Sequence, residues 1–382
     1  MLLKTPPMGF NTWNSFGENI SADLLKETAD AMVDQGLAAA GYEYIVIDDC
    51  WAERERDPKT GKIIPDHNKF PKGMKDLSDY IHAKGLKFGM YSCCGVRTCA
   101  NYPGSFNHEF LDAQTFAEYG CDYLKYDDCF RPGTVDTVVL YRRMGMALKA
   151  CGRDIVYSIC HADRDKDGEW SRAIGGSLWR STNDIHDSYE SFMNIAVSQL
   201  NNYCYNYPGC FNDMDMLTVG MYGGGDNVHV RTTTGCNDEE YKSQFALWCL
   251  FGSPLMLGCD VRKLRPAARD LLTNKDLIAI DQDPEARGII DVSCFKEDKY
   301  RLSVMRHLSN NKIAIGLFNK NGEPERDVQL LLSNCGLPMS GGYGLKMREI
   351  FSGEETGIIK DYFVTKIPHH GCKVYIAEVV KC

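Results

Sequence analysis

The segment that decides the fold reads Tyr123-Leu-Lys-Tyr-Asp-Asp-Cys129, an aromatic and aliphatic stretch that ends in two adjacent carboxylates. Its residue types favour a buried β-strand, and the charged groups follow at the point where that strand ends. A second segment of this kind, Trp179-Arg-Ser-Thr-Asn-Asp-Ile185, occurs later in the chain. A single Asp after a strand often caps the next helix, whereas a pair of carboxylates at neighbouring strand ends is the minimum needed to cleave a glycosidic bond.

Short apolar runs alternate with amphipathic stretches from Met8 to about Pro284, as in parallel strands joined by crossover helices. Strands are expected at residues 8–15, 44–51, 86–92, 123–129, 155–160, 178–185, 211–219 and 254–260. Helices are expected at 22–35, 75–83, 137–150, 188–201 and 239–251. Eight strand–helix units match a (β/α)₈ TIM barrel of about 250 residues, whose chemistry sits at the carboxyl ends of the strands. We therefore predict a catalytic barrel over residues 1–290.

The periodicity changes near Asp291, where apolar and polar residues begin to alternate between Asn-Gly, Ser-Gly and Gly-Gly turns. Strands are expected at residues 300–306, 312–318, 327–332 and 373–378. We therefore predict a C-terminal antiparallel β-sandwich over residues 291–382. It holds no catalytic cluster, so we assign it to packing and regard it as a candidate surface for a homo-oligomer.

The composition is that of an ordinary globular protein, with 382 residues of which 44% are hydrophobic and 25% charged. A formal net charge of −9 argues against nucleic acid and anionic membranes as partners, because both select basic patches. No apolar run is long enough for a signal peptide or a membrane span. Several of the 17 cysteines lie inside apolar patterns, as buried thiols do. We expect a cytoplasmic protein, or a secreted one if a leader was removed, that binds a small neutral ligand.

Aromatic rings and carboxylates occur at the expected carboxyl end of nearly every strand. In chain order these ends supply Trp13; Asp48, Asp49 and Trp51; Tyr91, Cys93 and Cys94; Lys125, Asp127 and Asp128; Cys160 and His161; Trp179, Arg180 and Asp184; Asp213, Asp215 and Met216; and Asp260. Pyranose sugars need this mixture, because charged groups bind the hydroxyls while rings pack on the C–H face. The sequence therefore predicts a sugar site.

The same segments carry a family resemblance. They read MGFNTWNSF (8–16), IDDCW (47–51), GLKFGMY (85–91), PGS (103–105), YLKYDDC (123–129), WRSTND (179–184) and NDMDM (212–216). With them the chain resembles the α-galactosidase/α-N-acetylgalactosaminidase family of retaining glycoside hydrolases, from its start through the sandwich. The resemblance implies a barrel followed by a sandwich, no cofactor, and double displacement at an axial anomeric linkage of a small glycoside.

By motif, the resemblance implies that Asp127 is the nucleophile and Asp184 the general acid/base. It also implies substrate-binding roles for Asp48 and Asp49 at the 4- and 6-hydroxyls, Lys125 beside the nucleophile, Arg180 and Asp215 around the 2-position, and Trp13, Tyr91 and Met216 in the pocket wall. Asp128 stands where the family usually has Asn or Gly. Cys99 and Cys129 match a pair that is disulfide-bonded in secreted members, which leaves their state here open.

The two catalytic carboxyls need opposite protonation states. Asp127 must be ionised, and we expect Lys125, two residues earlier on the same strand face, to lower its pKa. Asp184 must start protonated, and we expect burial and the charge of Asp127 to raise its pKa. A retaining pair should lie about 5–5.5 Å apart, against about 6.5–9.5 Å in an inverting enzyme.

Two sites depart from the family pattern. Cys93 and Cys94 stand where an Asp and a small residue usually follow the Tyr91-Ser92 pair. After Cys160, the run from His161 to Trp170 replaces the usual Glu-Trp of galactosidases or Ser-Trp of N-acetylgalactosaminidases, in the loop that contacts the sugar's 2-substituent.

We expect Cys160 and His161 to contact the substrate, with His161 donating to the 2-hydroxyl of a galactoside. Ala162 also leaves room for an acetamido group, so α-N-acetylgalactosaminidase and β-L-arabinopyranosidase stay open as alternatives. A sugar-binding protein without catalysis is disfavoured, because both Asp127 and Asp184 are present.

The cysteines at the strand ends raise a metal alternative. Thiolates and an imidazole suit zinc, and the residues concerned are Cys93, Cys94, Cys99, Cys129, Cys160 and His161. They show no Cys-x-x-Cys spacing, so we predict no metal. The Gly-rich segment 221–236 is expected to be a loop inserted after the seventh strand, which either rims the pocket or contacts a neighbouring subunit.

Overall fold

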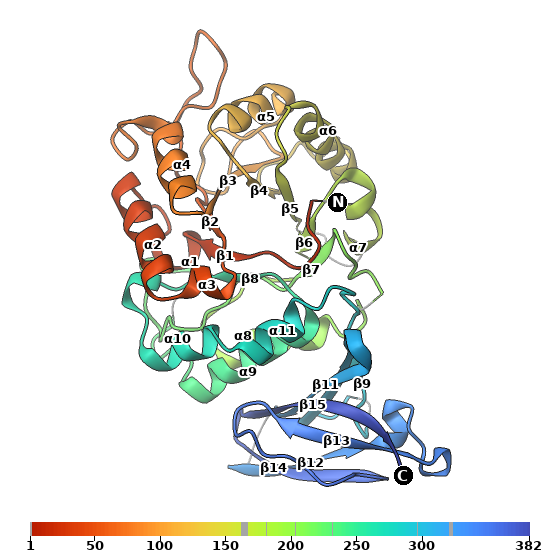
Figure 1. Ribbon diagram of the computed structural model, residues 1–382. Coiled ribbons are helices and arrows are strands. Elements are labelled where there is room, and N and C mark those ends of the chain that lie inside the picture. Colours follow the sequence, from red (N-terminus) through yellow and green to blue (C-terminus); the bar gives the residue numbers. More distant parts are fainter. Residues whose placement is uncertain are drawn as a thin grey trace.

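The computed structural model describes residues 2–161, 167–180, 182–202, 204–230, 232–295, 297–320 and 324–382. Eight parallel strands form one sheet in the order β7-β6-β5-β4-β3-β2-β1-β8. They are β1 (Met8–Asn11), β2 (Tyr44–Val46), β3 (Lys87–Cys93), β4 (Tyr123–Asp127), β5 (Val156–Cys160), β6 (Leu178–Arg180), β7 (Phe211–Asp213) and β8 (Leu255–Leu257). A parallel bridge between Leu217 and Leu257 joins the two edges of the sheet. The predicted (β/α)₈ barrel is confirmed, and Figure 1 shows its helices around the strands.

Six of the eight strands end earlier than predicted, and after β2, β4 and β7 an acidic side chain accepts a hydrogen bond from the next backbone N–H group. Asp48 Oδ1 accepts from Asp49 N at 2.9 Å, and Asp127 Oδ1 accepts from Asp128 N at 2.8 Å. Asp215 Oδ1 accepts from Met216 N at 2.7 Å. Such local bonds compete with the ladder between strands and turn the chain outward. The site residues after β2 and β7 therefore lie in loops just beyond the sheet.

The described residues form eleven α-helices, and α2, α4, α6, α8 and α9 begin and end close to the five predicted positions. They are α1 (Trp13–Phe16), α2 (Ala22–Asp34), α3 (Leu37–Ala40), α4 (Gly73–Ala83), α5 (Glu109–Glu118), α6 (Thr137–Ala150), α7 (Asp167–Trp170), α8 (Tyr189–Ser198), α9 (Asp238–Phe251), α10 (Pro266–Leu272) and α11 (Lys275–Asp281). Local signals explain the starts: the Ser21 side chain accepts from Leu24 N, and Asn237 and Glu240 form a capping box. The other six helices were not predicted; the longest of them, α5, was missed because its buried face includes Glu109 and Asp112, which pair with arginines.

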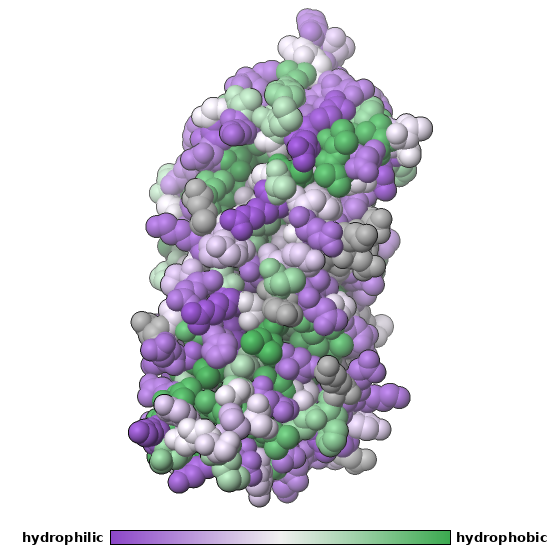
Figure 2. All heavy atoms as spheres, turned by 90° about the vertical axis from the view of Figure 1, so that its right-hand side faces the viewer, coloured by the Kyte–Doolittle hydropathy of each residue, from purple (hydrophilic) through white to green (hydrophobic). Residues whose placement is uncertain are grey.

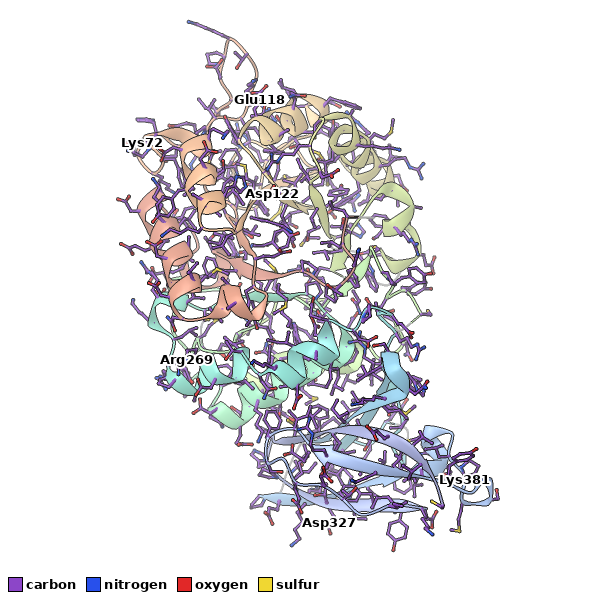
Figure 3. All side chains as sticks on the ribbon, viewed as in Figure 1. Lys72, Glu118, Asp122, Arg269, Asp327 and Lys381 are labelled. Carbon is purple, nitrogen blue, oxygen red and sulfur yellow. A yellow bond between two sulfur atoms is a disulfide. The ribbon has the colours of Figure 1, made fainter. Side chains whose placement is uncertain are left out.

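The amino end of the barrel has its own charged group. Asp122, labelled in Figure 3, lies just before β4 and accepts from Phe88 N at 2.9 Å. Its carboxylate also pairs with His82 at 2.7 Å and with Arg153 at 2.5 Å. These partners come from α4 and the segment before β5, so Asp122 ties neighbouring units together at the end away from the predicted site.

The C-terminal part is an antiparallel sandwich, as predicted. A five-stranded sheet, β13-β15-β11-β10-β9, lies with a two-stranded sheet, β12-β14. The strands are β9 (Ile290–Asp291), β10 (Arg301–His307), β11 (Lys312–Asn319), β12 (Glu325–Leu331), β13 (Tyr343–Glu349), β14 (Tyr362–Pro368) and β15 (Cys372–Lys381). Strands β9, β13 and β14 were not predicted; most residues of β14 are exposed or half-buried, which weakens its apolar alternation. Strand β9 lies across the predicted boundary between the two domains, at residues 290 and 291, and this boundary stays a prediction.

The sandwich packs against α8 and α9 of the barrel (Figure 1). Arg306 of β10 is fully buried, and its Nη1 donates to the Cys249 carbonyl at 3.0 Å. His370, in the turn before β15, stacks on Tyr189 with ring centroids 3.5 Å apart and bonds Glu240 at 2.7 Å. These contacts fix the sandwich to the barrel on the flank formed by α8 and α9.

The surface is predominantly hydrophilic on the face shown in Figure 2, where hydrophobic residues form separate groups. Within the described residues, none of the helices combines the length and the apolar composition needed to cross a bilayer.

Candidate active site

A cavity of about 780 Å³ opens at the carboxyl ends of the barrel strands. Its lining includes eleven of the twelve predicted site residues: Trp13, Asp48, Asp49, Tyr91, Lys125, Asp127, His161, Arg180, Asp184, Asp215 and Met216. Cys160 is the exception, because it is buried on β5 and faces a small space beneath the cavity. Residues far apart in sequence thus meet where the barrel topology predicts.

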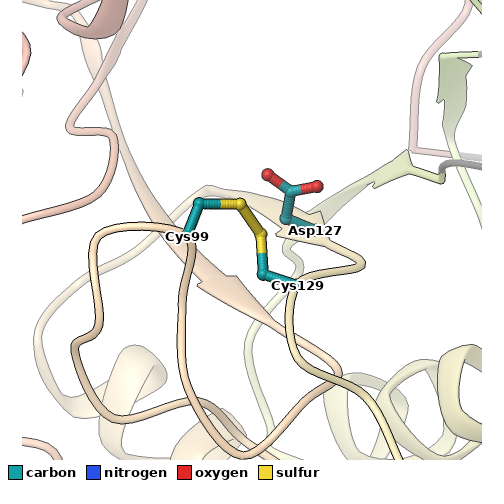
Figure 4. A group of neighbouring side chains, drawn as sticks. All are labelled: Cys99, Asp127 and Cys129. Atoms are coloured by element: carbon teal, nitrogen blue, oxygen red, sulfur yellow. A yellow bond between two sulfur atoms is a disulfide. The ribbon is translucent and has the colours of Figure 1, made fainter. Parts of the chain in front are cut away.

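Asp127, the last residue of β4, is half-buried and held from two sides. Tyr91 donates its hydroxyl to Asp127 Oδ2 at 3.0 Å, while the Asp128 amide binds the other oxygen. Figure 4 shows its carboxylate beside the disulfide between Cys99 and Cys129, which joins the loop after β3 to the end of β4. Two neighbouring segments are therefore locked together around Asp127.

The disulfide answers the question that the sequence left open. Cys99 and Cys129 are bonded to each other, so two of the six ligands considered for zinc are not thiolates. Disulfides are typical of oxidising compartments. The cytoplasmic location stays a prediction, and this bond weighs against it.

Lys125 is bonded to the carboxylate of Asp48. Its Nζ donates to Asp48 Oδ2 at 2.8 Å, and Asn11 Nδ2 donates to the same oxygen at 2.8 Å. Burial acts to lower the pKa of Lys125, but Asp48, with smaller help from Asp127, raises it above its usual value. The ammonium therefore stays charged next to two carboxylates, although its hydrogen bond goes to Asp48.

Asp49 is a carboxyl that titrates near neutral pH. Burial raises its pKa to about 6, against the opposing effect of bonds from Ala100 N, Thr98 and Cys50 N. Ala100 N reaches Asp49 Oδ2 at 3.0 Å, and Ala100 adjoins the disulfide cysteine Cys99. The loop after β3 therefore helps to hold Asp49 ionised.

Asp184 departs from its predicted environment. We expected burial to raise its pKa, but 73% of its side chain is exposed, and Arg180 Nη2 binds its Oδ1 at 2.7 Å. Strand β6 ends at Arg180, so the chain has left the sheet before it reaches Asp184. The expectation of burial is wrong for the protein without substrate. The predicted 5–5.5 Å separation from Asp127 stays a prediction.

Asp215 is held in a strained conformation by several bonds. Its φ is 73°, a region that non-glycine residues rarely adopt, and such strain clusters at functional sites. Ile185 N donates to its Oδ2 at 2.9 Å, and Trp248 Nε1 donates to its carbonyl at 2.8 Å. Arg180 Nη1 lies 3.3 Å from the same Oδ2, so this cation joins Asp215 to Asp184.

Two family models match this chain. The family model "Alpha galactosidase A" matches residues 5–283, and the model "Alpha galactosidase C-terminal beta sandwich domain" matches residues 303–377. This chain belongs to the α-galactosidase family.

Individual relatives agree with this assignment. The chain is 38% identical over 380 residues to the α-galactosidase of Cyamopsis tetragonoloba, covering 98% of this chain and 86% of that protein. It superposes on α-galactosidase I of Mortierella vinacea with a TM-score of 0.89 at 30% identity, covering 98% and 97% of the two chains. The α-galactosidase of Saccharomyces cerevisiae, solved with raffinose, gives a TM-score of 0.87 at 27% identity, covering 99% and 98%.

His161, which departs from the α-galactosidase pattern, contacts two acidic residues at the cavity wall. His161 Nδ1 bonds Asp167 Oδ1 at 2.8 Å, and its Nε2 lies 3.6 Å from Asp128 Oδ2. Asp128 in turn binds Arg131 Nε at 2.9 Å and the Cys94 thiol at 3.3 Å. The departures at Cys94, Asp128 and His161 are thus parts of one contact group. Ala162 lies outside the described residues.

Several cavity residues were missed by sequence reasoning. They are Asn14, Ala100, Asn183, Ile185, His186, His229 and Val230, whereas Cys99, Asp128 and Cys129, which also line the cavity, were named from the sequence for other reasons. Asn14, Asn183 and Ile185 lie inside the last residues of the predicted strands 8–15 and 178–185, so including every residue at those ends would have found them, whereas Ala100, His229 and Val230 lie deeper in loops. His229 and Val230 come from the loop 221–236, which therefore rims the cavity, one of the two options left open for it.

Proposed function

We propose that this chain hydrolyses terminal α-D-galactosyl residues of small glycosides by double displacement, with Asp127 as the nucleophile and Asp184 as the general acid/base. The observation that carries these roles is the cavity at the carboxyl ends of the strands, where both carboxylates meet the polar groups of a sugar site. Raffinose, present in the Saccharomyces cerevisiae structure, is a candidate substrate because it ends in an α-galactosyl group.

In the first step Asp127 attacks the anomeric carbon while Asp184 gives its proton to the leaving oxygen. The hydroxyl of Tyr91 and the amide of Asp128 orient the attacking carboxylate. In the second step Asp184, now ionised, takes a proton from water, which releases galactose from Asp127 with its configuration retained. Arg180 Nη2 lies 2.7 Å from Asp184 Oδ1 and orients this carboxyl at the cavity.

Recognition of the axial 4-hydroxyl rests on the buried Asp48 and Asp49, which are both 2% exposed. A buried carboxylate that meets this hydroxyl loses its partner when the equatorial epimer binds. Sites that hydrogen-bond a substrate group reject analogues that lack it by about 10⁴ or more. We therefore expect α-glucosides to be very poor substrates.

For the 2-position we propose a hydroxyl rather than an acetamido group. His161 is 6% exposed and is held between Asp167 and Asp128, so its ring fills space that an acetamido methyl needs. The N-acetylgalactosaminide and the β-L-arabinopyranoside remain alternative substrates. We also propose that the protein forms a homo-oligomer and binds neither nucleic acid nor membranes.

The test has two arms. Nitrophenyl α-galactoside, α-glucoside, α-N-acetylgalactosaminide and β-L-arabinopyranoside are compared by kcat/KM, and the α-galactoside should lead. Asp127→Ala should lose turnover and recover part of it with azide, giving a galactosyl azide of inverted configuration. A preference for the N-acetylgalactosaminide would refute the assignment at His161, and near-native activity of Asp127→Ala would refute the nucleophile.

A further inference from the structure

The cavity has room on one side for more than a galactosyl ring. Pockets of about 300–1,000 Å³ enclose drug-sized ligands, and this one measures about 780 Å³. The side in question carries Asp184, which delivers a proton to the leaving oxygen under the proposed function. The group that leaves must therefore contact residues around Asp184.

Two segments surround Asp184 at the cavity. Asn183, Ile185 and His186 belong to its own loop, while His229 and Val230 come from the loop 221–236. The amide of Asp187 donates to the Val230 carbonyl at 3.2 Å, so the two segments lie against each other. Asn227 Nδ2 donates to the Trp13 carbonyl at 3.0 Å, which places the same loop across the ends of β6 and β1.

One buried carboxylate fastens both ends of this loop. Asp187 is fully buried and accepts from Gly223 N at 2.6 Å and from Cys236 N at 3.4 Å. The Tyr241 hydroxyl of α9 bonds the same carboxylate at 2.9 Å. Asp226 N also donates to the Ser15 carbonyl at 2.7 Å. The described residues of the loop, 221–230 and 232–236, are therefore held against the barrel as a wall of the cavity.

The wall offers groups that suit a saccharide. Ile185 and Val230 are buried, at 1% and 4% exposed, and support the wall from within, whereas His186 and His229 are exposed at the cavity. Within the described part of the chain, neither imidazole makes a side-chain hydrogen bond or ion pair, so their ring nitrogens are available to hydroxyl groups.

We infer that the loop 221–236 and residues 183–186 bind the leaving group as a saccharide, with His186 and His229 bonding its hydroxyls. This inference rests on the proposed function. It makes the loop a determinant of which galactosides are cleaved, separate from the residues that bind the galactosyl ring. Because the galactosyl-enzyme has already lost its leaving group, this wall acts on the first step and on any sugar acceptor that enters in its place.

The test compares His186→Ala, His229→Ala and the double variant with His369→Ala, an exposed histidine of the sandwich that serves as the matched control. Each is assayed with raffinose and with 4-nitrophenyl α-galactoside. We expect the double variant to lose roughly 10- to 100-fold in kcat/KM on raffinose, as for one or two lost hydrogen bonds, and less than about twofold on the aryl substrate. Transfer of galactose from the aryl donor to an added disaccharide should fall relative to hydrolysis.

The outcomes separate the inference from the function beneath it. Equal losses on both substrates, or an unchanged ratio of transfer to hydrolysis, would overturn the inference while the enzyme stays an α-galactosidase. Failure of the unmodified protein to cleave either substrate would instead overturn the proposed function.

Discussion

The carboxyl end of the barrel and the core of the sandwich are built on opposite principles. Around the cavity, burial raises the pKa values of Asp49 and Asp213 to about 6, and Cys50 and Asp215 have positive φ angles. The sandwich core instead consists of aliphatic and aromatic side chains, with members such as Ile315, Leu317, Val328 and Leu330. The barrel end thus keeps groups that disfavour folding because the chemistry needs them, whereas the sandwich contributes stability.

The sharpest test of this contrast is Asp127→Asn. We expect turnover of α-galactosides to fall by roughly 10³-fold or more, as for other residues that act directly on the reacting atoms. The free energy of unfolding should stay the same or rise, because a charge leaves a crowded cavity. Kinetics and urea unfolding measure the two quantities. A marked loss of stability would contradict the view that Asp127 serves chemistry rather than folding.

For Arg306→Met, between the barrel and the sandwich, we expect lost stability with unchanged activity. Arg306 is buried, and Asp281 and Asp283 are the carboxylates that act on it. Arg306→Met leaves the buried Cys249 carbonyl without the donor at 3.0 Å, and an unpaired buried polar group costs about 1–3 kcal/mol, with more expected where a charged group is involved. We expect that loss in urea unfolding, with KM for α-galactosides unchanged.

A matched control for Arg306 is the double variant Arg306→Met with Asp281→Asn. Burial raises the pKa of Asp281 and Arg306 opposes this effect, so the double variant also removes the carboxyl that loses its nearby cation and should recover part of the loss. If the two single variants simply add, Arg306 and Asp281 do not act as a pair.

Asp213→Asn tests whether the buried carboxylate of Asp213 lowers the free energy of unfolding. Burial, with Asp215, raises the pKa of Asp213 from 3.8 to about 6, against the effect of Arg180. The folded state therefore disfavours the ionised form, so the destabilisation is present above about pH 6 and absent below about pH 3.8. We expect a gain on the order of 2–3 kcal/mol at pH 7.5 and little change at pH 4. Equal gains at both pH values would point to packing instead.

The smallest expected effect concerns Asp49 and pH. Its pKa of about 6 means that the carboxylate becomes protonated as the pH falls below that value. A protonated Asp49 accepts sugar hydroxyls poorly, so KM should rise roughly tenfold between pH 7 and pH 5. Asp49→Asn should raise KM at neutral pH and flatten this dependence. If KM rose equally for both proteins as the pH fell from 7 to 5, the titration would belong to another group.

Much of the architecture was predictable because it depends on local patterns. The eight apolar runs gave the barrel, and strand ends such as the one at Asp127 gave most of the cavity. The exposure of Asp184 was not predictable, since it depends on β6 ending at Arg180. The bond of Lys125 to Asp48 depends on contacts across strands, which no run of residues encodes. Glu109 and Asp112 hid α5, because their arginine partners lie far away in sequence.

The bridge between Leu217 and Leu257 closes the barrel between its first and last strands in the sheet order. The loop 221–236 begins only a few residues after Leu217. A closure of this kind is a place where a lineage can add or exchange residues without disturbing the ladders that hold Asp127 and Tyr91. Grafting this loop from other members of the family offers a modular route to enzymes that cut different galactosides. Because the loop is anchored on Asp187, a graft that keeps this anchor should carry its preference with it.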